Sequence, residues 1–343
     1  MKNYWLLYIV LFAYITMFTA CSKQNSALTL GFDDIRYIKE FKDNQELQVD
    51  TSFIINMHVS DLVIADTFLL LHSGSWDIHC LPQMTSLGML FSRGHAKGEF
   101  IQIPAVYKSA FYKENGDLYT VVYDVQRGKS LKVNISKSII GDSLYMEEVR
   151  HKVVSRLDRY LYIDDSTYIT RENVKGTKPK KLQYYRNNKV VRNKNLDKLN
   201  SIDIASEDYN SLAALSGYSK KYNTLILAYT QFNIINIIPL SKNAKSGITL
   251  CYGKEGIDLD NVVDALQTKN FYYELRVYDD YFAVLCVKDK KHPTIQFYGY
   301  DGSAILEYKL AKPATSFDID WKNNHLYAYN DEEGTLVRYK ITK

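Results

Sequence analysis

The feature that most constrains the fold of this chain is a repeated pattern of paired short strands. Six stretches share one form, in which a polar turn leads into a short aliphatic and aromatic segment, a second turn and a second such segment. They are SDLVIADTFLLLHSGSWDIHCL (60–81), NGDLYTVVYDVQRGKSLKVNI (115–135), LDRYLYIDDSTYITRENVKG (157–176), KKYNTLILAYTQFNIINIIPL (220–240), YDDYFAVLCVKDKKHPTIQFYGYDG (278–302) and KNNHLYAYNDEEGTLVRYKI (322–341).

The spacing of these units predicts their architecture. Their anchor positions follow one another at 43 to 64 residues and are Leu62, Leu118, Leu161, Leu225, Phe282 and Leu326. Each interval has room for four strands of about five or six residues, the size of one propeller blade. A radial arrangement also removes long exposed sheet edges. We therefore expect an all-β fold, a six-bladed β-propeller over residues 31–343, and the alternative is two smaller β-domains divided near residues 175–198.

Composition and turn residues favour strands. The chain has 29 Tyr and 14 Phe against six Pro, and aromatic residues favour extended backbone. Asp301-Gly302, Asn323-Asn324 and Glu333-Gly334 are typical of hairpin turns, and the aliphatic run 225–240 is expected to form two buried strands.

Two short helices are also expected. The segment 260–269 starts with a capping aspartate and has apolar residues at helical spacing, and 206–217 could end with Gly217 as its C-cap.

The N-terminus resembles a bacterial lipoprotein signal. Lys2 precedes an uncharged apolar run that ends in Thr19-Ala20-Cys21 and turns polar as SKQNS. We expect residues 1–20 to be the signal peptide, Cys21 to carry lipid, and 21–30 to form the tether. The alternatives are an uncleaved anchor or a secretory signal that leaves Cys21 free, and both place the body outside the cytoplasm. SKQNS carries no acidic residue, which favours a periplasm-facing outer-membrane lipoprotein over a surface-exposed one.

Together with the signal and the six units, the loop GHAKGEF after the first hairpin resembles the six-bladed β-propeller lipoproteins of Gram-negative gut bacteria, which are related to NHL-type and TolB-like propellers. That family often carries G-x-G-P-G-E-F/Y here. Gly94, Gly98, Glu99 and Phe100 match, whereas Ala96 and Lys97 replace glycine and proline. The resemblance implies the propeller fold, and it implies little about function, because propellers host enzymes, scaffolds and receptors on one frame.

The stretch FSRGHAKGEF (91–100) does not fit a nucleotide-binding loop. A P-loop needs Lys and a hydroxyl after its second glycine, where this chain has Glu99 and Phe100, and the glycine spacing does not fit G-x-G-x-x-G. We interpret it as a connection between blades in which Glu99 caps backbone N–H groups or pairs with a basic neighbour. The alternative is a ligand-binding loop at the propeller mouth formed by Arg93, His95 and Glu99.

No catalytic or metal-binding pattern stands out. Cys80, Cys251 and Cys286 cannot all pair, and the last two are expected to be buried in strands. The chain has no metal-ligand spacing and no nucleophile motif, so no cofactor is expected. Adjacent acids are expected to be turn residues: Asp33-Asp34, Glu147-Glu148, Asp164-Asp165, Asp279-Asp280 and Glu332-Glu333. A net charge of +4 gives no reason to expect a nucleic-acid partner.

One basic run interrupts this even distribution of charge. Between Lys175 and Lys198 there are nine Lys or Arg and one acid, Asp197. We expect a basic hairpin at an outer edge, where lysines discourage edge pairing, and the alternative is a patch that contacts an anionic envelope surface, a glycan or a partner protein.

These observations favour a lipid-anchored, non-enzymatic binding or scaffold protein for an envelope protein, peptide or glycan. The alternatives are a metal-assisted propeller enzyme of the lyase or lactonase type, for which His58, His72, His95, His151, His292 and His325 would be candidate ligands, and an assembly factor for outer-membrane proteins.

Overall fold

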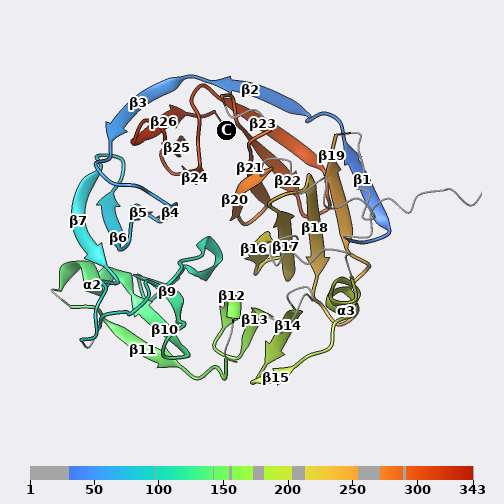
Figure 1. Ribbon diagram of the computed structural model, residues 1–343, viewed down its shortest axis with the longest axis horizontal. Helices are drawn as coiled ribbons and strands as arrows, with labels where there is room; N and C mark the ends of the chain where they lie inside the picture. Colours follow the sequence, from blue (N-terminus) through green and yellow to red (C-terminus); the bar gives the residue numbers. More distant parts are fainter. Residues whose placement is uncertain are drawn as a thin grey trace, which may run out of the picture.

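The chain folds into a six-bladed β-propeller, as the repeat predicts. A computed structural model describes residues 31–96, 98–141, 143–153, 157–172, 181–202, 213–253, 271–288 and 291–342. Six antiparallel sheets, two of which carry an added parallel strand, radiate from a common centre (Figure 1). The two-domain alternative is wrong, because the sheets on both sides of residues 175–198 belong to one ring.

The strands of each blade follow one another from the axis to the rim. The first three blades are β4 (Asp61–Ala65), β5 (Phe68–His72), β6 (Trp76–Cys80) and β7 (Thr85–Leu90); β8 (Tyr112–Glu114), β9 (Asp117–Asp124), β10 (Lys129–Asn134) and β11 (Met146–Val149); and β12 (Leu157–Asp164), β13 (Thr167–Glu172), β14 (Lys181–Arg186) and β15 (Lys189–Val190). The last three are β16 (Ala214–Ser219), β17 (Thr224–Tyr229), β18 (Ile234–Pro239) and β19 (Ile248–Tyr252); β20 (Tyr272–Val277), β21 (Tyr281–Cys286), β22 (Thr294–Gly299) and β23 (Ala304–Leu310); and β24 (Ser316–Asp320), β25 (His325–Asn330) and β26 (Thr335–Lys340).

The N-terminal segment forms a belt around the last three blades, which the repeat does not predict. Strand β1 (Asp34–Ile38) pairs with β19 and β2 (Asp43–Leu47) with β23, both in parallel, and β3 (Val49–Ile54) pairs with β26 in antiparallel orientation. Figure 1 shows these strands as a blue band along the rim. Because β3 and β26 come from opposite ends of the chain, their pairing closes the ring. The last unit therefore supplies three strands of its own, and the fourth comes from the N-terminal segment.

The hydrophobic core is divided among the blade interfaces. The described residues form six buried clusters, and each joins two neighbouring blades. A blade is therefore covered on both faces, which explains the nearly continuous apolar runs of β17 and β18. Cys251 and Cys286 lie in these interfaces as buried residues, as expected.

The loose spacing of the units has a simple origin. The anchors Leu62 and Leu161 lie on innermost strands, whereas the other four lie on second strands. The second strands begin at the more evenly spaced positions 68, 117, 167, 224, 281 and 325.

The expected hairpin turns are largely confirmed, whereas the expected helices are not. Gly302, Asn324 and Gly334 have positive φ at the expected hairpin turns, although Asp301 does not. The helix expected over 206–217 is wrong from Ala214 onward, because that part is β16, and the rest of it and the helix 260–269 lie outside the described residues. A Cβ on Gly217 would lie 2.5 Å from Val277 Cγ2, so glycine here lets two innermost strands approach each other.

Two helices form where none was expected, α2 (Ile135–Ile140) and α3 (Lys194–Asn200), and each begins after an asparagine whose side chain accepts backbone N–H groups. The basic hairpin is confirmed for β14 and β15, but the run ends in α3. Among the acid pairs, Asp279-Asp280 and Glu332-Glu333 occupy turns, whereas Glu147-Glu148 lies in β11.

The expected signal peptide, Cys21 and tether lie outside the described residues. Within the described ranges, no helix is long and apolar enough to cross a membrane.

Candidate functional site

A connecting segment fills the centre of the ring. The chain leaves β7 at Leu90 and reaches β8 at Tyr112, and within this long connection a 3-10 turn, η1 (Lys108–Ala110), contacts the innermost strands β4, β12, β16 and β20. The Trp76 indole N–H donates to the Pro104 carbonyl at 3.0 Å and fixes the segment where it turns inward. The same segment lines a hollow on each side of it, so η1 divides the axial channel.

A buried charge cluster surrounds this plug. The axial cluster consists of Asp61, Lys108, Glu274, Arg276 and Asp318. Arg276 lies 2.6 Å from Asp61 Oδ1 and 2.7 Å from Glu274 Oε1, and its Nε is 3.9 Å from Asp318. Lys108 Nζ lies 2.9 Å from Asp318 Oδ2. The cluster therefore ties the plug to β4, β20 and β24.

Asp318 is the most constrained of these groups. Its carboxylate is 0 % exposed, and it accepts hydrogen bonds from the Ile64 N–H at 2.7 Å and from the Tyr278 hydroxyl at 2.8 Å. A buried carboxylate needs several such partners to offset its lost hydration. In β24 the apolar residues Phe317 and Ile319 alternate with Asp318. All three side chains are nevertheless buried, because the polar face of this strand is covered by the axial cluster.

The cluster holds two cations and three carboxyl groups, so one proton makes it neutral. Burial raises the pKa of Glu274 above its ordinary range, although Arg276 opposes the shift. Burial lowers the pKa of the Arg276 guanidinium, but Glu274, Asp61 and Asp318 together outweigh this effect and raise it. Burial therefore favours the protonated form of Glu274.

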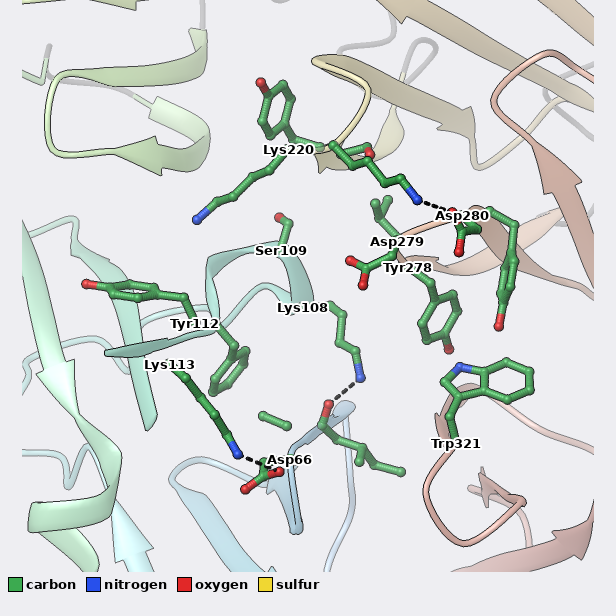
Figure 2. Close-up of a pocket in the computed structure, with 18 of the residues that line it drawn as sticks. Asp66, Lys108, Ser109, Tyr112, Lys113, Lys220, Tyr278, Asp279, Asp280 and Trp321 are labelled. Atoms are coloured by element: carbon green, nitrogen blue, oxygen red, sulfur yellow. Dashed lines mark hydrogen bonds and ion pairs between the residues drawn. The ribbon is translucent and has the colours of Figure 1, made fainter. Parts of the chain in front are cut away.

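On one side of the plug lies the axial pocket, a hollow of about 470 Å³. This volume is within the range of small-molecule sites. Figure 2 shows charged and aromatic side chains that converge on it from the turns after the innermost strands. The charged lining residues are Asp66, Lys108, Lys113, Lys220, Lys221, Asp279 and Asp280, and the aromatic ones are Phe111, Tyr112, Tyr218, Tyr278, Tyr281 and Trp321.

Most charges in the axial pocket are paired within the protein. Lys113 Nζ lies 3.0 Å from Asp66, Lys221 contacts Asp280, and Lys108 reaches down to Asp318. Among the described residues, Lys220 and Asp279 form no ion pair, and Figure 2 draws no dashed line to either. One amine and one carboxylate that line the pocket thus stand outside the ion pairs of the described structure.

The Lys220 amine lies against aromatic rings and close enough to two carboxylates to feel their charge. Its Nζ lies 5.2 Å from the ring centres of both Tyr112 and Tyr162, so the amine makes cation–π contacts with two rings. This partial desolvation lowers the pKa of Lys220, and Asp164 and Asp165 oppose the shift. On the other side, the buried Trp321 indole N–H has no partner among the described residues. The pocket lining therefore combines an amine and a carboxylate outside ion pairs with several aromatic rings.

The opposite side of the plug is also hollow, with a volume of about 280 Å³. His72 lines it, stacks on Trp76 with ring centres 4.8 Å apart, and lies 2.7 Å from the Ser60 hydroxyl. His72 is one of the six histidines considered as metal ligands. Within the described part of the chain, no three His, Cys, Asp or Glu side chains gather in a group that could hold a metal ion.

The predicted ligand residues of the loop 91–100 do not line the axial pocket. Arg93 and His95 are exposed, and the Glu99 carboxylate accepts the Ala96 N–H at 2.9 Å, the capping contact that the sequence predicts. A Cβ on Gly94 would lie 2.0 Å from Glu99 Oε2, so a larger residue here would displace the Glu99 carboxylate. Ligand binding by this loop stays a prediction.

Sequence reasoning missed the axial residues, although one signal was present. The connection from Leu90 to Tyr112 is long for a propeller, and long connections between strands are often functional. Asp279 was read only as a turn residue. Nothing local distinguishes Lys220 from other lysines, because its rings come from two other blades.

Comparisons with known proteins support the fold alone. No protein-family model matches the chain, and no curated protein matches it. A Bacteroides fragilis protein described as exported matches with a TM-score of 0.51 at 13 % identity, over 90 % of this chain and 100 % of that one. An auxiliary nutrient binding protein from Bacteroides ovatus matches with a TM-score of 0.50 at 6 % identity, over 84 % of this chain and 70 % of that one. A β-propeller domain from Myceliophteria thermophila has a TM-score of 0.47 at 11 % identity, over 86 % of this chain and 100 % of that one.

Proposed function

We propose that this chain is an exported cell-envelope propeller, anchored by lipid on Cys21, that binds its ligand in the axial pocket without catalysing a reaction. The lipoprotein-like N-terminus supports export and anchoring, and two structural neighbours are described as an exported protein and a nutrient binding protein. The orientation we propose is the periplasm-facing one, because SKQNS carries no acidic residue.

The observation that carries the binding role is the pairing of charges in the axial pocket. Lys220 and Asp279 remain without ion-pair partners in the described structure, while Lys113, Lys221 and Lys108 are paired. A ligand that brings an anionic and a cationic group meets both unpaired charges at once. Such a ligand also replaces the water around Asp279 by a charge-assisted hydrogen bond.

A short peptide with free ends is the ligand class that fits this arrangement best. Its carboxylate would pair with Lys220 and its ammonium group with Asp279. The rings of Phe111 and Tyr278 supply the apolar contact that pockets of this kind need. An oligosaccharide offers hydroxyl groups to the same side chains but no charge.

Calorimetric titration with a tripeptide tests this role. We expect the tripeptide with free ends to bind at least about tenfold more tightly than the same peptide with both ends blocked, a difference of about 1.4 kcal/mol. Lys220→Gln and Asp279→Asn should each remove that preference. Lys42→Gln, an exposed lysine on the belt, is the matched control and should keep it. Equal binding of free and blocked peptides, or preferential binding of an oligosaccharide, would refute the charge-pairing argument.

Anchoring is tested separately. Mass spectrometry of the N-terminal peptide from the membrane fraction should show Cys21 as the first residue, carrying acyl chains. A retained signal with unmodified Cys21 would overturn the anchoring proposal and would leave the pocket proposal unaffected. Protease treatment of whole cells should leave the body intact if it faces the periplasm.

A further inference from the structure

The described chain begins beside a basic part of the rim. Phe32 is buried in the cluster between the third and fourth blades together with Leu196 and Leu199 of α3. Asp33 pairs with Lys198 of the same helix at 2.8 Å. The point where the N-terminal segment joins the ring is therefore fixed against α3. Figure 1 shows α3 at the rim, close to the start of β1.

A second basic segment meets the first at this point. The side chain of Asn195 in α3 donates to the Lys245 carbonyl at 3.1 Å, and a Cβ on Gly247 would lie 2.4 Å from the Phe32 ring. The loop between β18 and β19 thus packs against both α3 and the start of the chain. We call the basic rim the basic side chains of β15, of α3 with the residues just before it, and of the loop between β18 and β19: Lys189, Arg192, Lys194, Lys198, Lys242 and Lys245.

Among the described residues, few acids accompany the basic rim, and exposed apolar residues lie within it. Asp197 is the one acid among residues 181–202, and Asp33 is paired with Lys198. Val190 and Val191, between Lys189 and Arg192, are 56 % and 36 % exposed. A surface that combines basic and aliphatic side chains in this way fits the interface of an anionic lipid layer, where the charges attract headgroups and the valines enter the boundary region.

We propose that the basic rim docks on an anionic phospholipid surface and so sets how the ring stands on its membrane. The length of chain before Phe32 fits this role. Gly31 lies ten steps along the chain from Cys21, which limits the tether to about 36 Å at full extension. The tether therefore joins the body at the same part of the rim that carries the basic side chains. This inference takes the position of the membrane from the proposed anchoring at Cys21.

Docking through the basic rim would place the ring edge-on. The axis of the propeller would then run roughly along the membrane, because the rim lies at the side of the ring in the view down the axis (Figure 1). The membrane would then cover neither face of the ring, so the hollows on both sides of η1 would stay accessible. The axial pocket could then receive a ligand without the membrane covering it.

Co-sedimentation with vesicles tests the proposal without the lipid anchor. The chain that begins at Ser22, which keeps every described residue, is mixed with phosphatidylcholine vesicles with or without phosphatidylglycerol. We expect binding to the anionic vesicles that weakens as salt is raised. The variant K189E/R192E/K194E should bind at least about tenfold more weakly, because three attractive charges become repulsive ones.

The control reverses three exposed lysines elsewhere, K42E/K322E/K340E, which changes the net charge equally and removes no described ion pair. It should bind far more strongly than the rim variant. Because Lys194 lies in α3, K189E/R192E gives the same comparison if the triple variant does not fold. Equal loss in the control, an unchanged affinity in the rim variants, or no preference for anionic vesicles would overturn the proposal. Neither an unlipidated Cys21 nor an empty axial pocket would affect this measurement.

Discussion

The two halves of the ring are built from the same repeating unit but differ at the rim. The last three blades are covered by β1, β2 and β3, whereas the first three end in β7, β11 and β15. On the belt, Leu47 is 5 % exposed, while Met89 on β7 is 67 % exposed. The fourth strands β19 and β23 are therefore interior strands of their sheets, whereas β7, β11 and β15 are edges. The difference shows that a distant segment of the chain, and not the unit itself, decides how a blade ends.

The two halves are joined in two places. At the rim, β3 pairs with β26 and closes the ring. At the axis, the charge cluster links Asp61 and Lys108 from the first half to Glu274, Arg276 and Asp318 from the second. The predictions below remove these links or compare the two rims.

Removal of the belt should have the largest effect. A chain that begins at Ile55 lacks β1 to β3 and leaves the last blade with three strands, so we expect it to aggregate or to lack a cooperative unfolding transition. A chain that begins at Lys39 lacks only β1 and the Phe32 side chain. It should fold, with a loss of about 3–5 kcal/mol in the free energy of unfolding. Circular dichroism and denaturant titration distinguish the two. Cooperative unfolding of the shorter chain would show that closure by β3 is dispensable.

The axial link comes next. Asp318→Asn keeps the shape of the side chain but leaves Lys108 and Arg276 without their shared buried partner. We expect it to lower the free energy of unfolding by about 3–5 kcal/mol, the range for one partner of a buried ion pair. Asp320→Asn is the control, because Asp320 caps its own turn through Lys322 and Asn323 and takes no part in the cluster. Equal effects of the two changes would contradict the role of the cluster.

Matched truncations compare the two rims. Leu47→Ala removes a side chain packed in the cluster between the fifth and sixth blades and should cost about 2–5 kcal/mol. Met89→Ala on the uncovered rim should stay within about 0.5 kcal/mol of the unaltered protein. Denaturant titration measures both. A loss at Met89 as large as that at Leu47 would mean that an unseen contact covers β7.

Hydrogen exchange should separate the same rims in the unaltered protein. Strand β19 lies between β18 and β1, whereas β11 has a neighbour on one side only. Amides of β19 should exchange at least about tenfold more slowly than those of β11, because an edge strand opens locally. Similar exchange in both strands would indicate that the belt is displaced easily.

The smallest effect is expected from the ion pair that fastens the end of the belt. Arg338 of β26 lies 2.6 Å from Asp50 of β3, and this hydrogen bond lowers the pKa of Asp50 below its ordinary value of 3.8. The stabilisation is present above that value and is lost as the pH falls through the lowered pKa of the folded state. Asp50→Asn should therefore reduce the melting temperature slightly at neutral pH and not at strongly acidic pH. A reduction of the same size at both would assign the effect to something other than charge.

The sequence by itself determined the features of this protein that depend on contacts between residues close together in the chain. The alternation and turn residues of the six units were sufficient for the hairpins, the blade count and the buried aliphatic strands, because pairing within a blade joins neighbours in sequence. The positive φ of Asn324 and Gly334 follows from residue type in the same way. Glu99 could be read as a cap because its partner is Ala96, three residues away.

Only the tertiary structure decided what lies at the rim and the axis. Nothing in residues 34–54 indicates that they pair with β19, β23 and β26, because those partners lie more than 200 residues away. The backbone groups at the open edge of a sheet can also form hydrogen bonds with any extended segment, whatever its sequence. Asp318 and Asp279 look alike in the sequence, as acids next to apolar residues. Asp318 is buried at the axis beside Lys108, whereas Asp279 lines the axial pocket and forms no ion pair in the described structure, because blades distant in the chain decide which charges lie near each of them.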